Sequence, residues 1–185
     1  MHSLHFKHLF GADPHAWGAI GFPSSQSPTN ALQSYRRGDP VLLAVTKHPD
    51  PVVDESRWRG LEGKIFGVCT LLHIDVATEE YANQELARRF PELARRWRRA
   101  TPIDEMWLFD EPASYDVFGS GQLLRLCRSH QGKLIHLARY PKLENELQDW
   151  LSSQRKRPVE IYRSPRALEI IRLRTSGKPE QPAAQ

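Results

Sequence analysis

Hydrophobic and polar positions predict three strands in the first half of the chain. Residues 4–10 alternate apolar with polar or basic side chains, which is the period of a half-buried strand. Residues 41–46 are apolar on both faces and predict a central strand that is covered on each side. Residues 63–74 predict a further strand with a bulge or bend at Gly67. The last two strands, joined by a hydrophilic connection, suggest a hairpin in an antiparallel barrel.

Helical spacing dominates the rest of the chain. Residues 78–100 form the clearest helical region, which Pro91 divides into two short helices. Residues 29–35 predict a short helix that Thr29 or Asn30 caps, and residues 15–28 predict an ordered loop or short strand. Amphipathic helices are expected at 141–152 and 165–174. The remaining predicted strands cover residues 106–109, 123–127 and 133–137, with a turn from Asp110.

Composition limits the class of protein. The chain has 185 residues, of which 39% are hydrophobic, enough for one core and a small subdomain. Its apolar runs are too short to cross a membrane, which takes about 20 residues. Cys69 and Cys127 lie in apolar segments and are expected as buried free thiols, which favours a cytoplasmic protein. We expect one domain over residues 1–152, a helical extension over 153–174 and a disordered tail over 175–185.

Positive charge is concentrated in one segment. The formal net charge of the chain is only +4, but residues 88–99 hold six arginines and one glutamate. Such an excess favours a phosphate-rich partner. The alternative is a solvated helix face that pairs with Glu79, Glu80 and Glu85. Trp97, between two arginine pairs, tips the balance toward nucleic acid because an aromatic ring in a basic surface can stack on a base.

The tryptophans suggest a second feature of the site. Trp107 and Trp150 are expected in the core, whereas Trp17 lies in a glycine- and serine-rich loop and Trp97 in the basic segment. Trp17 and Trp97 could form two walls of an aromatic slot that holds a flat base by stacking and dispersion. The plainer alternative for both is a place in the core.

Catalytic and metal-binding patterns are weak. No Cys/His pair has the spacing of a zinc site, and neither a phosphate-binding glycine loop nor a nucleophile elbow occurs. Asp110 and Glu111 follow a predicted strand, where nucleases sometimes hold a metal, but a turn is the simpler interpretation. We therefore expect no catalytic residue, no metal and no cofactor.

Several short motifs follow one another in a characteristic order. After Trp17 come residues 35–39, Tyr-Arg-Arg-Gly-Asp, which lead into the apolar strand at 41–45. This order resembles the PUA-like superfamily, especially its EVE and YTH branches. Residues 63–68, Gly-Lys-Ile-Phe-Gly-Val, are similar to the G-x-x-x-G-V signature of the next strand. Residues 106–112 resemble a strand of YTH domains that follows a Trp-rich segment. The similarity covers roughly residues 4–150.

This resemblance implies an α+β fold: a PUA-like mixed, mostly antiparallel β-barrel with flanking α-helices. It also implies a pocket that binds a modified, typically methylated, base. Trp17 corresponds to one wall of the YTH cage and Trp97 is the nearest match to the second wall. Gly18 and Ala19 stand where a polar residue that contacts the base is expected, and Ser24 and Ser25 are possible substitutes. The expected phosphate contacts are Arg36, Arg37, Arg95, Arg96, Arg98 and Arg99.

Our leading hypothesis is a non-enzymatic domain that binds a modified base in DNA or RNA. A second hypothesis is a nuclease or base-processing hydrolase on a PUA- or ASCH-like fold, with Lys47, His48, Asp75 and Asp110 as candidate groups. A third is a protein-interaction module in which the arginine-rich segment binds an acidic partner. The choice between DNA and RNA, the modification and the oligomeric state stay open at this point.

Overall fold

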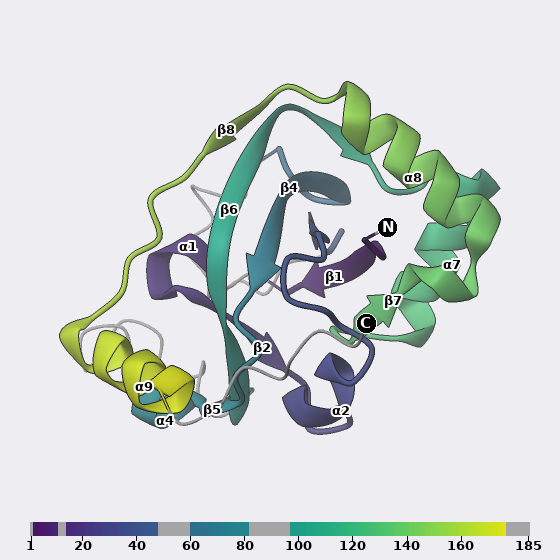
Figure 1. The fold of residues 1–185 in the computed structure, drawn as a ribbon. Helices are drawn as coiled ribbons and strands as arrows, with labels where there is room; N and C mark the ends of the chain where they lie inside the picture. Colours follow the sequence, from purple (N-terminus) through teal and green to yellow (C-terminus); the bar gives the residue numbers. More distant parts are fainter. Residues whose placement is uncertain (1, 11–13, 48–59, 82–96, 177–185) are drawn as a thin grey trace, which may run out of the picture.

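The computed structural model describes residues 2–10, 14–47, 60–81 and 97–176. Within these residues the chain forms an α+β fold in which one curled, mixed sheet makes a half-barrel (Figure 1). Six strands follow the order β2-β6-β4-β3-β1-β7, and β5 and β8 also pair with β6. The neighbours β1 and β3 run parallel, and the other paired strands run antiparallel. The expected mixed, mostly antiparallel sheet is therefore confirmed.

The strands differ greatly in length. The longest is β6, whose first residues pair with β2 and β5 and whose later residues pair with β4 and β8. Strand β6 therefore connects the part of the sheet that contains β2 and β5 with the part that contains β4 and β8. The strands are β1 (His5–Leu9), β2 (Ala19–Phe22), β3 (Val41–Val45), β4 (Lys64–Leu71), β5 (Val76–Ala77), β6 (Arg99–Ser114), β7 (Leu134–His136) and β8 (Lys156–Pro158).

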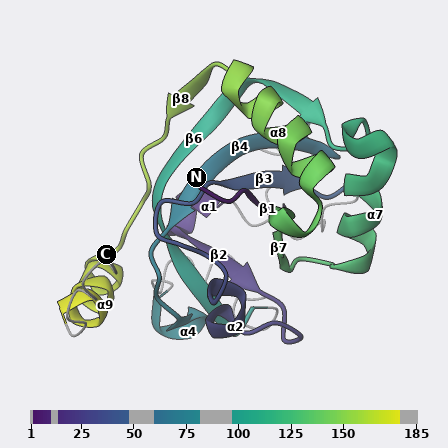
Figure 2. The same ribbon diagram turned by 45° about the vertical axis from the view of Figure 1, so that its right-hand side comes forward.

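Helices lie at the open sides of this sheet. Figure 2 shows α7 and α8 together on one side, and α9 well apart from them at the end of the chain. The helices are α1 (Pro14–Trp17), α2 (Pro28–Leu32), α4 (Thr78–Tyr81), α7 (Gln122–Ser129), α8 (Pro141–Ser153) and α9 (Pro165–Ser176), with 3₁₀ turns η1 (Phe118–Gly121) and η2 (Leu137–Arg139). No helix in these described ranges is long and apolar enough to cross a membrane.

Strand β1 is buried on both faces, so the expectation of a half-buried strand is wrong. Phe6 belongs to a core that α7 and α8 cover, and Leu9 belongs to a second core beneath α2 and β2. His5, Lys7 and His8 are consequently buried with them, at 0%, 1% and 6% exposure. Burial removes water from ionisable groups, so a positive charge on any of these three side chains costs free energy in the folded protein.

Several other predictions are confirmed. Strand β3 is buried throughout, it forms an antiparallel pair with β4, and the register of β4 against β6 shifts around Gly67. Strand β2 lies inside the predicted loop or strand region, β7 matches its prediction, and α8 and α9 occur where amphipathic helices are expected. Both cysteines are buried free thiols. Trp107 and Trp150 pack against the first core.

Five local predictions are wrong. Residues 123–127 lie in α7, because Leu123, Leu126 and Cys127 are buried at helical rather than alternating spacing. Residues 99 and 100 begin β6 instead of ending a helix, and β6 continues through the turn predicted at Asp110. The cap of α2 is Ser27, whose hydroxyl accepts from the Asn30 amide at 3.2 Å. The α9 helix includes residues 175 and 176 of the expected tail, and the second helix predicted from Pro91 falls largely outside the described residues.

Candidate functional site

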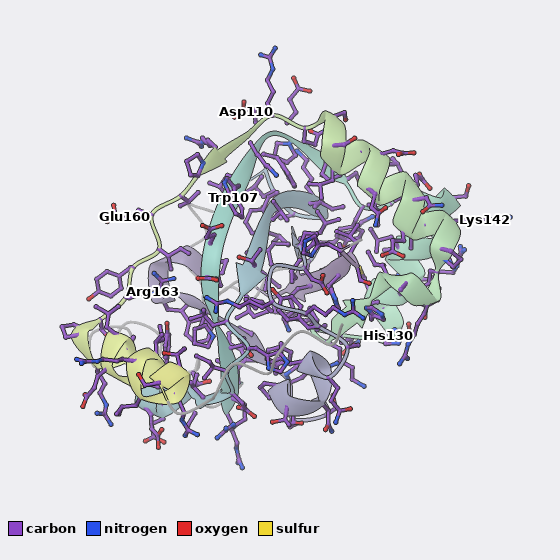
Figure 3. All side chains as sticks on the ribbon, viewed as in Figure 1. Trp107, Asp110, His130, Lys142, Glu160 and Arg163 are labelled. Carbon is purple, nitrogen blue, oxygen red and sulfur yellow. The ribbon has the colours of Figure 1, made fainter. Side chains whose placement is uncertain are left out.

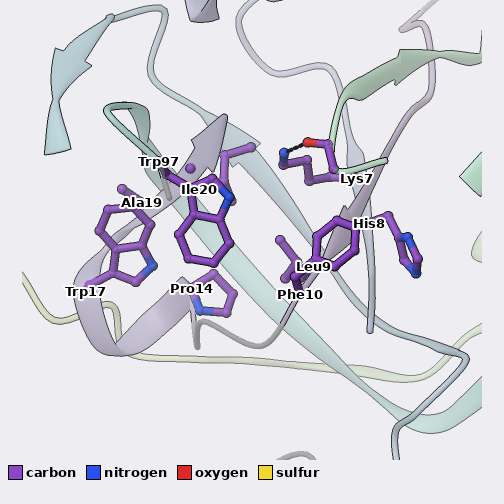
Figure 4. Close-up of a pocket in the computed structure, with 11 residues that line it drawn as sticks. Lys7, His8, Leu9, Phe10, Pro14, Trp17, Ala19, Ile20 and Trp97 are labelled. Atoms are coloured by element: carbon purple, nitrogen blue, oxygen red, sulfur yellow. Dashed lines mark hydrogen bonds between the residues drawn. The ribbon is translucent and has the colours of Figure 1, made fainter. Parts of the chain in front are cut away.

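The structure brings Trp17 and Trp97 to one pocket, although 80 positions separate them in the sequence. The pocket lies between the end of β1, the α1–β2 turn and the start of β6, and we call it the tryptophan pocket (Figure 4). Figure 4 shows the two indoles toward one end, with Phe10 and Lys7 toward the other. Its lining residues are Lys7, His8, Leu9, Phe10, Pro14, Trp17, Ala19, Ile20, Gly21, Trp97 and Gly132.

The two tryptophans differ in accessibility. Trp17 is only 3% exposed and packs in a small core with Tyr81 and Val76, whereas Trp97 is partly exposed and packs against that core from outside. The cavity has a volume of about 10 Å³, room for about one water molecule, while ligand sites measure roughly 300–1,000 Å³. A base therefore enters only if a lining side chain moves, and Trp97 is the less tightly packed of the two indoles.

Backbone contacts fix where Trp17 sits. It ends the single turn of α1, and the next residue, Gly18, has a φ of +72°, a conformation that suits glycine. The Gly18 carbonyl accepts hydrogen bonds from the Ile103 amide at 2.9 Å and the Tyr81 hydroxyl at 3.1 Å. A β-carbon on Gly18 would lie 2.5 Å from the Tyr162 carbonyl oxygen. This close approach leaves no room for a side chain at position 18.

Trp97 is held by strand pairing. Gly21 of β2 pairs with Ala100 of β6, and this register lays Trp97 over the β2 backbone. A β-carbon built on Gly21 would lie 2.5 Å from Cγ of Trp97. The indole thus occupies the space that any other residue at position 21 would fill. Trp97 lies in an irregular segment just before β6, not on the helix that its sequence context predicts.

Two buried basic groups flank the pocket. Lys7 donates a hydrogen bond to the Gly132 carbonyl oxygen, and burial lowers its pKa from 10.5 to about 7. The pKa of the neighbouring His8 falls to about 4, first because of burial and then because of the nearby Lys7 charge. Perturbed groups in a pocket are typical of functional sites, although buried structural groups are perturbed as well. Sequence reasoning missed Lys7 because it expected the polar face of β1 to be in solvent.

The predicted phosphate contacts do not all lie free in solvent. Arg36 and Arg98 are exposed, and Arg37 lies 3.6 Å from Asp104. Arg99 binds Asp75 through both Nε and Nη2, at 2.7 and 2.6 Å, so much of its charge is already compensated. The predictions for Arg95 and Arg96 lie outside the described residues.

The Arg-Gly-Asp motif before β3 has a structural role. Asp39 is fully buried, and its carboxylate accepts from the amides of Ser3 and Arg36 at 3.2 and 2.9 Å. His2 lies 3.1 Å away, and His5 Nε2 is 3.5 Å from Asp39 Oδ2. Asp39 therefore ties the start of β1 to the loop that leads into β3.

The two serines proposed as base contacts are elsewhere. Ser24 and Ser25 are exposed on the turn after β2, and neither lines the tryptophan pocket. Their assignment as substitutes for a polar residue after Trp17 finds no support in this geometry.

A second basic segment follows α8 and was missed by the sequence reasoning. Residues 155–174 hold seven Lys and Arg residues against two Glu, and we call this the C-terminal basic segment. Arg155 and the β8 residues Lys156 and Arg157 are exposed. The chain after β8 passes over Gly18, where the Tyr162 carbonyl and the Ile161 side chain pack, and Figure 3 shows Arg163 along the same stretch. A count of charged residues over positions 155–174 would have revealed the C-terminal basic segment in the sequence.

The candidate groups of the enzymatic hypothesis are separately engaged. Lys47 forms an ion pair with Asp116, whereas Asp75 accepts from Arg99 and from the Thr29 hydroxyl at 2.8 Å. Asp110 is exposed at the far end of β6 (Figure 3), and His48 lies outside the described residues. Among the described residues, no group of three or more His, Cys, Asp or Glu could hold a metal ion. No observation favours a hydrolytic site at these positions.

The close approach at Gly18 gives a stability prediction. Gly18→Ala should cost about 1–2 kcal/mol for its left-handed backbone and about 1–3 kcal/mol more for the contact with the Tyr162 carbonyl. Gly60→Ala is the matched control, because Gly60 has a φ of +86° with nothing within 4 Å of a β-carbon. Urea unfolding of both variants measures the difference. Equal costs in the two variants would contradict the packing of residues 161 and 162 against the α1–β2 turn.

Comparison with known proteins identifies no family, since no family model, no curated protein and no solved structure matches the chain. The resemblance to PUA-like domains therefore stays a prediction, and the function has to be argued from the site itself.

Proposed function

We propose that this protein binds a nucleic acid, stacks one modified base, most simply a methylated one, against Trp97 in the tryptophan pocket, and holds the phosphates with nearby basic residues. The observation that carries this proposal is that Trp17 and Trp97 line one pocket together with Phe10. Stacking on an aromatic side chain contributes about 1–3 kcal/mol per base. A methyl group adds only about 0.8 kcal/mol, so phosphate contacts must supply much of the affinity.

The curled sheet with flanking helices suits a PUA-like barrel, and we include that family in the proposal. Two basic regions are available: Arg98 and Arg99 directly after Trp97, and the C-terminal basic segment, whose first residues lie along the later part of β6. Because Arg99 is paired with Asp75, Arg98 is the exposed candidate directly beside the pocket. Arg155 and the exposed residues of β8 are candidates for phosphates farther along β6, since Lys156 lies opposite Phe109.

The phosphate part of the proposal predicts a salt-dependent loss of affinity in one charge variant. Replacing Arg155, Lys156 and Arg157 together by alanine should lower affinity for a single-stranded oligonucleotide at least tenfold in 50 mM salt. The slope of log affinity against log salt should fall by about 0.7 for each phosphate that the variant no longer neutralises. Fluorescence anisotropy of a labelled oligonucleotide at several salt concentrations measures both quantities.

A matched control removes the same charge elsewhere. Arg128, Arg139 and Lys142 are exposed on the α7–α8 side of the molecule, and Figure 3 shows Lys142 far from β8. Their combined replacement by alanine should change affinity much less. Equal effects of the two triple variants would mean that net charge alone drives binding, and no binding by the wild type would reject the proposed function.

A further inference from the structure

Lys7 is a buried cation in the lining of the tryptophan pocket. A lysine in a strand normally extends its ammonium group to water, and fully buried lysines are rare unless they are paired. Lys7 is 1% exposed because both faces of β1 are covered. It has no carboxylate within ion-pair distance among the described residues, so its charge is not compensated there.

The contacts of Lys7 leave a donor available. Its Nζ donates to the Gly132 carbonyl oxygen and lies 4.7 Å from the centre of the Phe22 ring. An ammonium group has three hydrogens to donate, and these two contacts engage at most two of them. Both Lys7 and Gly132 line the pocket beside Trp97. A ligand in the pocket therefore meets a hydrogen-bond donor that the protein has not fully used.

We propose that Lys7 selects the base, by donating a hydrogen bond to a carbonyl oxygen on the edge of a keto base such as thymine or uracil. This inference rests on the proposed function, because it requires a base in the pocket. Stacking accepts every base, whereas a donor or acceptor at the base edge discriminates among them. Where thymine carries its 4-carbonyl oxygen, adenine carries an amino group, which would place two donors opposite each other.

Burial supports this role. It removes water from the Lys7 side chain, so the ammonium group gains a partner when a carbonyl oxygen arrives. Because burial also lowers the pKa of Lys7 to about 7, the donor role is strongest below neutral pH. A buried polar group without a partner costs about 1–3 kcal/mol. A site built in this way rejects a ligand without the acceptor more strongly than stacking alone would.

The test uses a labelled DNA nonamer whose central nucleotide carries the only base, the other eight being abasic. Thymine should bind about tenfold more tightly than adenine at pH 6, where Lys7 is protonated, although adenine has the larger stacking surface. Lys7→Met, which keeps the length and apolar stem of the side chain, should abolish this preference without changing affinity for the fully abasic nonamer. A thymine preference that persists in Lys7→Met would overturn the inference.

A second arm needs only the wild-type protein. Difluorotoluene has the shape of thymine but lacks its strong acceptors, so the nonamer that carries it should bind about tenfold more weakly than the thymine nonamer. Equal binding of these two would overturn the role of Lys7 while leaving base stacking intact. Equal binding of the thymine and fully abasic nonamers would instead reject the pocket as a base site, and with it the proposed function.

Discussion

Acidification from pH 6.5 to pH 4 is expected to lower the free energy of unfolding by several kcal/mol. His5 and His8 are buried in β1, and both pKa values fall from 6.5 to about 4. Burial is the main cause for each. His136 lowers the pKa of His5 further, while Asp39 partly offsets this. In this pH range the unfolded chain therefore binds protons that the folded protein does not.

The sign follows from proton linkage. A histidine whose folded pKa is lowered favours the fold above its unfolded pKa, and this advantage disappears as the pH falls toward the folded pKa. One pKa unit corresponds to about 1.4 kcal/mol, so the two groups together give a decrease on the order of 5 kcal/mol. Small domains have only about 5–15 kcal/mol in total, so acid should come close to unfolding the protein.

Urea unfolding at pH 7.0, 5.5 and 4.5 measures this decrease. His8→Phe should remove about half of it, because phenylalanine fits a site between the rings of Phe10 and Tyr115 and cannot bind a proton. The other half should remain in this variant, because it leaves His5 in place. A stability that stays constant down to pH 4.5 in the wild type would contradict neutral, buried histidines.

The second large effect separates the two tryptophans of the pocket. Trp17→Ala should lower the free energy of unfolding by about 3–5 kcal/mol, because it deletes a buried aromatic side chain. Trp97→Ala should cost clearly less, since its indole is partly exposed. Urea unfolding of both variants measures this difference. Equal costs, or a larger cost at Trp97, would show that Trp97 belongs to the core and is not the movable wall.

This asymmetry determines which variant can test binding. Loss of binding by Trp17→Ala would not distinguish a missing pocket wall from a damaged fold. Trp17→Phe, which preserves an aromatic ring in the small core, and Trp97→Ala are therefore the informative substitutions.

The local pattern of apolar and polar residues was sufficient to predict much of the fold. The apolar run of β3, the bulge near Gly67 and the spacing of α8 all follow from residues close together in the sequence. The α7 helix was missed although its signal was present: Leu123, Leu126 and Cys127 recur at helical spacing. The short apolar run there satisfied a strand pattern as well, and periodicity alone does not separate the two in so few residues.

The candidate site depends on contacts between residues far apart in the sequence, which no local pattern reveals. Alternation in β1 identified a strand, but seven residues cannot show that a second layer covers the polar face and buries Lys7. Likewise, the proximity of Trp17 and Trp97 results from the β2–β6 register that sets Gly21 opposite Ala100. Trp17 and Trp97 could be selected from the sequence, whereas the position of Lys7 beside them became visible only in the structure.

The central claim is that one base stacks against Trp97 while basic residues hold the phosphates. The most direct measurement is an affinity panel of oligonucleotides that differ only in one modified or unmodified base, at two salt concentrations, with wild type and Trp97→Ala. We expect a modification-dependent offset in the wild type that Trp97→Ala abolishes, and a salt slope that the two proteins share. An offset that survives in Trp97→Ala, or an affinity that depends on salt alone in both proteins, would contradict the claim.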